Sequence, residues 1–109
     1  MKLLFAIVQN DDAKGLVNAL IEHEISVTRI SSSGGFLRGG NTTLMIGVEK
    51  ERVEETLAII RSRSSRREKL TAPAPAMPST NMETQYTPVR VPVGGATVFV
   101  VDAENCYKL

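Results

Sequence analysis

The stretch KLLFAIVQ, residues 2–9, restricts the fold more than any other, because it is apolar at odd and even positions alike. Successive side chains of a β-strand point to opposite faces, so this pattern predicts a strand that is buried on both sides. At 109 residues the chain is one domain by length, and it has few other elements with which to cover such a strand. The sheet that contains this strand therefore needs a packing layer on each face.

The rest of the chain alternates between helical and extended patterns. Apolar residues at helical spacing predict two helices, and β-branched runs predict three further strands, the last interrupted by Pro92 and the Gly94–Gly95 pair. Asn10 or Asp11 is expected to cap the first helix. The expected elements are strands at 2–9, 25–33, 41–49 and 89–101, and helices at 10–24 and 50 to about 63.

This order, β-α-β-β-α-β, predicts an α+β fold of the ferredoxin-like class, in which two helices lie on one face of a four-stranded sheet. The strands are nevertheless apolar on both faces: Leu44 and Ile46 share one face of the third strand, and Met45 lies on the other. Two helices cover only one face, so we expect the other face to pack against copies of the same chain. A closed cyclic oligomer, namely a homotrimer, meets this requirement most economically.

Charge and cysteine content favour a cytoplasmic protein with neither a nucleic acid nor a membrane as its partner. Thirteen basic and twelve acidic residues give a net charge of +1, which provides no general attraction to nucleic acid or to anionic lipid. Cys106 is the only cysteine, so no intramolecular disulfide forms, as is usual in a reducing cytosol. No apolar run approaches the roughly 18 residues of a transmembrane helix.

The sequence contains no recognisable catalytic or metal-binding pattern. His23 is the only histidine and falls near the end of the first predicted helix, where we expect a surface side chain. No cysteine–histidine cluster of the kind that binds zinc is present. The glycine pairs lie between strands instead of before a helix, which excludes the common phosphate-binding motifs. We therefore expect no catalytic residue, no metal and no cofactor, and the protein is not predicted to be an enzyme.

Two segments near the second helix have more than one interpretation. The run RSRSSRREK, Arg61–Lys69, is dense in cations; it forms either a solvated helix end near the negative pole of the helix dipole or a contact with an anionic partner or ligand. A proline-bearing loop follows at about 71–87. Loops of this length inside a compact domain are usually functional or disordered.

The glycine-rich loop at about 34–41 places Phe36 and Leu37 between two glycine pairs. Glycine pairs normally mark mobile backbone with polar neighbours, so an aromatic residue between them requires a partner. That partner is either a neighbouring subunit, for which the two apolar side chains serve as an anchor, or a flat ligand.

The block GGFLRGGNTT, with Thr28 upstream and Gly47 downstream, resembles the PII-like cyclic di-AMP receptors of bacteria. The stretch PVGGATVFV near the C-terminus and the opening MKLLFAIVQ are similar to the same family, so the resemblance covers nearly the whole chain. It implies one PII-like domain over residues 1–109, forming a homotrimer with one cyclic dinucleotide in each of three clefts between subunits. The loops at about 34–41 and 71–87 would then change conformation for an unknown target protein in signal transduction.

The resemblance also implies a set of ligand-binding residues, each with a physical reason. Phe36 would stack on a purine, and Leu37 would form a wall of the pocket. Gly35 lets the backbone approach the ligand, and Gly47 leaves room for a ligand against its strand. Hydroxyl and amide groups would pair with the ligand's edges at two further positions, Thr28 and Asn41. Without the resemblance, Gly47 reads equally as a packing constraint, and the two polar residues as ordinary strand and turn residues.

Two positions depart from the family pattern. Ser26 stands where that family commonly has an arginine able to meet a phosphate, and the nearest cation, Arg29, has the opposite strand phase. Lys108 stands near the place of the family's usual C-terminal glutamine. Ser26, Arg29 and Lys108 are nevertheless counted among the expected ligand-binding residues. These departures leave two alternatives to a cyclic di-AMP receptor: a PII-type regulator that binds ATP or ADP, and a structural or interaction trimer that has lost nucleotide binding.

Overall fold

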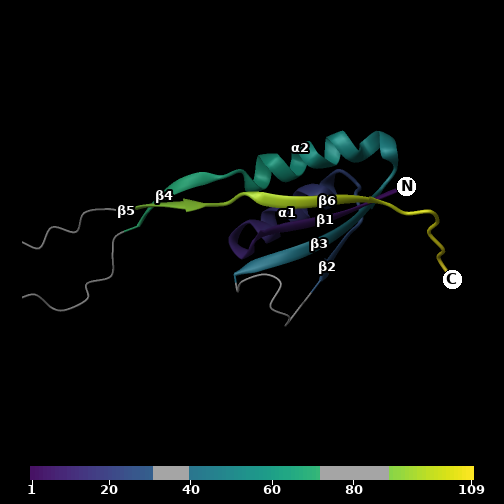
Figure 1. Ribbon diagram of the computed structural model, residues 1–109, viewed down its shortest axis with the longest axis horizontal. Helices are drawn as coiled ribbons and strands as arrows, with labels where there is room; N and C mark the ends of the chain where they lie inside the picture. Colours follow the sequence, from purple (N-terminus) through teal and green to yellow (C-terminus); the bar gives the residue numbers. More distant parts are fainter. Residues whose placement is uncertain (31–39, 72–88) are drawn as a thin grey trace, which may run out of the picture.

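The computed structural model describes residues 1–30, 40–71 and 89–109 (Figure 1). A short 3-10 turn, Lys50–Arg52, leads into the second helix. The remaining elements are β1 (Lys2–Gln9), α1 (Asn10–Glu22), β2 (Val27–Ile30), β3 (Asn41–Val48), α2 (Val53–Ser64), β4 (Arg67–Thr71), β5 (Val89–Val93) and β6 (Ala96–Asp102).

The main sheet has four strands in the order β2-β3-β1-β6, and each of its pairings is antiparallel. The central strand β1 pairs with β3 on one side and with β6 on the other. With α1 following β1 and α2 following β3, this arrangement fits the ferredoxin-like fold that the element order predicts. The α+β class is therefore confirmed.

The hydrophobic core lies between the sheet and the two helices. The even-numbered side chains from Leu4 to Val8 of β1 and from Leu44 to Val48 of β3 are buried, and Leu4 and Leu44 are fully covered. They pack in one cluster with Leu16 and Leu20 of α1 and Ile60 of α2. Odd-numbered side chains of the same strands are only partly buried, because no element in the described ranges covers them. We call this side of the sheet the uncovered face.

The region after α2 differs from the sequence-based expectation. The helix ends at Ser64, and the last three residues of the basic run begin β4, which pairs with β5 in a separate two-stranded sheet. Figure 1 shows this hairpin extending from the end of the main sheet opposite to the two chain termini. Arg and Lys occur in both helices and strands, so the local sequence does not distinguish the two. The segment forms a strand because it pairs with β5, and an exposed ion pair of Arg90 with Glu68, at 3.6 Å, lies across this pairing.

The last predicted strand is interrupted at the glycine pair 94–95, as expected, which divides it into β5 and β6, whereas Pro92 lies within β5 and does not interrupt it. Two smaller expectations are corrected. Neither Asn10 nor Asp11 caps α1: the N-cap residue is Gln9, without a side-chain cap, and Asn10 instead accepts a hydrogen bond from Thr42 Oγ1 at 2.6 Å. The second strand, predicted at 25–33, begins only at Val27.

Two further expectations concern the surface. His23 lies at the C-terminal end of α1 and is exposed, as predicted. Among the helices of residues 1–30, 40–71 and 89–109, none has the length and apolarity needed to span a membrane.

Candidate functional site

Three of the residues implied by the family resemblance share the uncovered face of the sheet. Thr28 of β2 lies opposite Met45 of β3. Because side chains alternate along a strand, Asn41 and Gly47 project to the same side as Met45. A Cβ atom added at Gly47 would have no atom within 4 Å, so packing inside the subunit does not require this glycine. The lack of a side chain there leaves space on the uncovered face.

These residues do not form one compact site within a subunit. Asn41 and Gly47 are six residues apart on β3, or about 20 Å at about 3.3 Å per residue. Thr28 and Ser26 lie toward the Gly47 end, since Val27 pairs with Ile46. The uncovered face therefore presents predicted ligand contacts near both of its ends.

The two cations proposed from sequence lie elsewhere. Arg29 is opposite Leu44, a core residue, so the register directs Arg29 to the face that the helices cover, away from Thr28. Lys108 is exposed in the segment after β6. The pairing of Lys2 with Asp102 shows that this segment leaves the sheet at the end where β1 begins.

Gly35, Phe36 and Leu37 lie outside the described residues. The structure does describe the end of their loop, where Gly40 adopts a φ of +103°, a conformation that favours glycine. The Gly40 carbonyl accepts a hydrogen bond from the Asn10 N–H group at 2.8 Å. This bond holds the end of the loop against the junction of β1 and α1.

A hollow of about 510 Å³ opens at the Asn41 end of the sheet. We call it the Gln9 hollow, because Gln9 is among the residues that line it. Gln9 also lines two recesses beside it. The Gln9 side-chain oxygen Oε1 accepts a hydrogen bond from the Gly94 N–H group at 2.7 Å. The described residues that line the Gln9 hollow are Ile7, Gln9, Asn41, Arg66, Gly94, Gly95, Ala96 and Thr97.

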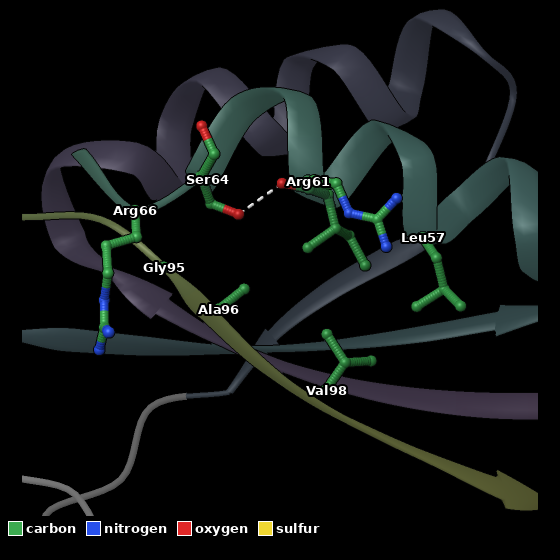
Figure 2. Close-up of a pocket in the computed structure, with 9 residues that line it drawn as sticks. Leu57, Arg61, Ser64, Arg66, Gly95, Ala96 and Val98 are labelled. Atoms are coloured by element: carbon green, nitrogen blue, oxygen red, sulfur yellow. Dashed lines mark hydrogen bonds between the residues drawn. The ribbon is translucent and has the colours of Figure 1, made fainter.

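A second hollow of about 290 Å³ lies on the other side of β6, between that strand and α2 (Figure 2). Leu57, Ile60 and Val98 form its apolar part. Figure 2 shows the Arg66 side chain leaving the chain just after α2 and passing beside Gly95. Arg66 lines both hollows, so this residue lies at the edge of the sheet, between the helix side and the uncovered face.

The Gly94–Gly95 pair holds the segment after α2 against β6. Both glycines have positive φ angles, +82° and +91°. A Cβ atom at Gly94 would lie 2.4 Å from the Ser65 carbonyl oxygen, a distance that no side chain tolerates. The Gly95 N–H group also donates a hydrogen bond to the Ser64 carbonyl. This close approach fixes the backbone from which Arg66 projects.

Arg67, the next residue, has a different role. It forms an ion pair with Asp12, with Nη2 and Oδ1 2.8 Å apart, and only 7% of the Asp12 side chain is exposed. The hydrogen bond to Asp12 raises the pKa of the Arg67 guanidinium group. Arg67 thus connects the β4–β5 hairpin to the first turn of α1.

In the described part of the chain, no three histidine, cysteine, aspartate or glutamate side chains are arranged to hold a metal ion. Of the residues that line the Gln9 hollow, the sequence did not indicate Gln9, and it included Arg66 only within the basic run that has two interpretations. The signals were a polar residue ending an otherwise apolar strand and an arginine in a basic run, and neither predicts that the two side chains line the same hollow.

Comparison with known proteins identifies the family of the chain. The profile of one protein family, described as "Cyclic-di-AMP receptor", matches residues 1–109. The chain is also similar to the crystal structure of a functionally unknown protein from Pediococcus pentosaceus, with a TM-score of 0.78 and 41% sequence identity over 99% of this chain and 96% of that chain. The match to the family extends over the whole chain, and so the chain belongs to the cyclic-di-AMP receptor family.

Proposed function

We propose that the protein is a non-catalytic signalling receptor that binds cyclic di-AMP in clefts between the subunits of a homotrimer. The match of the whole chain to the cyclic-di-AMP receptor family carries this proposal. Ligand binding then changes the conformation of the loops at about 34–41 and 71–87, which presents a different surface to a target protein. A preference of a few kcal/mol for the bound loop conformation is enough to switch the population.

The uncovered face supports the trimer. Leu3, Phe5 and Ile7 of β1 project from it, and Phe5 lies opposite Phe99 of β6. Phe99 is 50% exposed and Val101 is 43% exposed. Apolar side chains gathered on one face of a sheet favour a subunit contact, since each Å² of apolar surface that the contact buries contributes about 25 cal/mol of stabilisation.

The cleft chemistry follows from the residues that border this face. Thr28 and Asn41 supply hydroxyl and amide groups for the polar edges of an adenine, and Gly47 leaves space beside its strand. Phe36 stacks on the base and Leu37 packs beside it, while Gly35 admits the ligand close to the backbone. The predicted contacts lie near both ends of the sheet, which is consistent with a ligand that contacts more than one subunit.

The first experiment combines light scattering with calorimetry. Light scattering on a sizing column is expected to give the mass of three chains. Calorimetric titration is expected to give one cyclic di-AMP per chain, with no binding of ATP or cyclic di-GMP. Binding of ATP or ADP instead would establish a PII-type regulator, and a trimer that binds none of these nucleotides would establish an interaction scaffold.

The stacking role of Phe36 is tested by Phe36→Ala. A base stacked on an aromatic ring contributes about 1–3 kcal/mol, so this variant is expected to lose about ten- to hundredfold in affinity for cyclic di-AMP. Ile21→Ala is the control, because it removes an exposed apolar side chain from α1. Phe36→Ala should remain a trimer; unchanged binding by that trimer would rule out the stacking contact.

A further inference from the structure

We propose that Arg66 binds a phosphate group of the nucleotide at the Gln9 hollow. This inference rests on the proposed function and identifies the residue that provides positive charge to the ligand. The resemblance to the family does not point to Arg66, which belongs to the basic run that sequence alone left with two interpretations. The tertiary structure brings Arg66 beside Asn41, a predicted ligand contact, in the lining of one hollow.

The charge of the hollow supports an anionic ligand. Among the described residues that line it, Arg66 is the one charged side chain, and no carboxylate is present. Arg66 is exposed and makes no ion pair within residues 1–30, 40–71 and 89–109. Its neighbour Arg67 is already neutralised by Asp12. The unpaired guanidinium group is therefore the one available to a ligand, and its planar donors suit a phosphate.

Neutral donors surround this charge. Gln9 uses its Oε1 atom to accept the hydrogen bond from Gly94, which leaves its side-chain NH₂ group as a donor toward the hollow. Thr97 contributes a hydroxyl to the lining. The volume of about 510 Å³ falls within the range of small-molecule sites, about 300–1,000 Å³.

The backbone holds Arg66 in place before any ligand arrives. Its two preceding residues, Ser64 and Ser65, are packed against the Gly94–Gly95 pair, by a hydrogen bond and by the close approach that a Cβ atom would prevent. A cation on a fixed backbone loses less conformational freedom when it binds than one on a free loop. This packing also gives the glycine pair a role in the site that its sequence does not indicate.

The strand that precedes the glycine-rich loop provides no such charge on this face. Ser26 is uncharged, and Arg29 projects toward the helix side of the sheet. A dinucleotide with two phosphates still needs positive charge near it when it leaves water. Arg66 meets this need from the opposite edge of the sheet.

The test is a calorimetric titration with cyclic di-AMP of the wild type, Arg66→Gln, Arg66→Lys and Arg63→Gln. Arg63→Gln is a matched control, since it removes the same charge from an exposed position of α2 that lines neither hollow. Arg66→Gln is expected to weaken binding about ten- to hundredfold, the usual size of a charge-assisted hydrogen bond. Arg66→Lys is expected to recover part of this loss, and Arg63→Gln to bind as the wild type does.

Two further readouts separate a phosphate contact from a structural role. Raising the salt concentration should weaken binding by the wild type more than binding by Arg66→Gln, because salt screens the guanidinium charge. The melting temperature of the ligand-free protein should not change in Arg66→Gln. If the wild type binds cyclic di-AMP and Arg66→Gln binds equally well, the Arg66 inference is wrong and the receptor proposal stands. If the wild type itself does not bind, the receptor proposal fails and this inference fails with it.

Discussion

Gly94→Ala tests whether the junction between the hairpin and the main sheet depends on the absence of a side chain. Gly94 has a φ of +82°, and a Cβ atom there would lie 2.4 Å from the Ser65 carbonyl oxygen and 2.6 Å from Nη1 of Arg67. The Ser65 oxygen is a backbone atom and cannot rotate away. The substitution must therefore displace the segment after α2 from β6.

The expected loss of stability has two parts. Holding an L-residue at positive φ costs about 1–2 kcal/mol. Displacing the segment also weakens the bonds from Gly94 to Gln9 and from Gly95 to Ser64, each with a net contribution of about 0.5–1.5 kcal/mol. Gly94→Ala is therefore expected to lower the free energy of unfolding by about 2–5 kcal/mol.

Gly95→Ala is the matched control, because its φ of +91° carries the same conformational cost but its Cβ atom would meet nothing within 4 Å. It is expected to lose only about 1–2 kcal/mol. Urea unfolding of both variants, followed by circular dichroism at one protein concentration, gives the difference. Equal losses for the two variants would refute the argument from the Ser65 contact.

Two other predictions concern ion pairs. Arg67→Ala leaves the nearly buried carboxylate of Asp12 without its partner, so the hairpin loses its ion pair to α1. Amide hydrogen exchange is therefore expected to become faster in β4 and β5 but not in β1 or β3. Unchanged exchange in β4 and β5 would mean that the Arg67–Asp12 pair does not anchor the hairpin. Hydrogen bonds from Arg52 lower the pKa of Glu55. The Arg52–Glu55 pair therefore stabilises the fold at pH values above the ordinary glutamate pKa. This stabilisation is lost as the pH falls through the lowered pKa of Glu55. A carboxyl-carbon NMR titration is expected to show this lowered pKa in the wild type and a higher pKa of Glu55 in Arg52→Gln.

The sequence by itself determined the order of the main elements and the faces of the core. The apolar run of β1 predicts a strand buried on both sides, of which the subunit itself buries one, and the helical spacing of Leu16 and Leu20 predicts the face of α1 that packs on it. These patterns are local, because burial on one face repeats every two residues in a strand and about every 3.6 in a helix. A single sequence is enough to read them. The resemblance added the family, which the whole-chain profile match confirms.

Only the tertiary structure decided the parts that depend on distant pairing. Arg67–Thr71 becomes a strand because Val89–Val93 lies beside it, and the preferences of its own residues did not determine this. The register of β2 on β3 decided that Thr28, but not Arg29, faces the same side as Gly47. Gln9 and Arg66 are far apart in the chain but line one hollow. They do so because β6 pairs with β1 and because the Gly94–Gly95 pair packs against the end of α2. Such contacts depend on the meeting of several elements in space, which no local pattern in the sequence records.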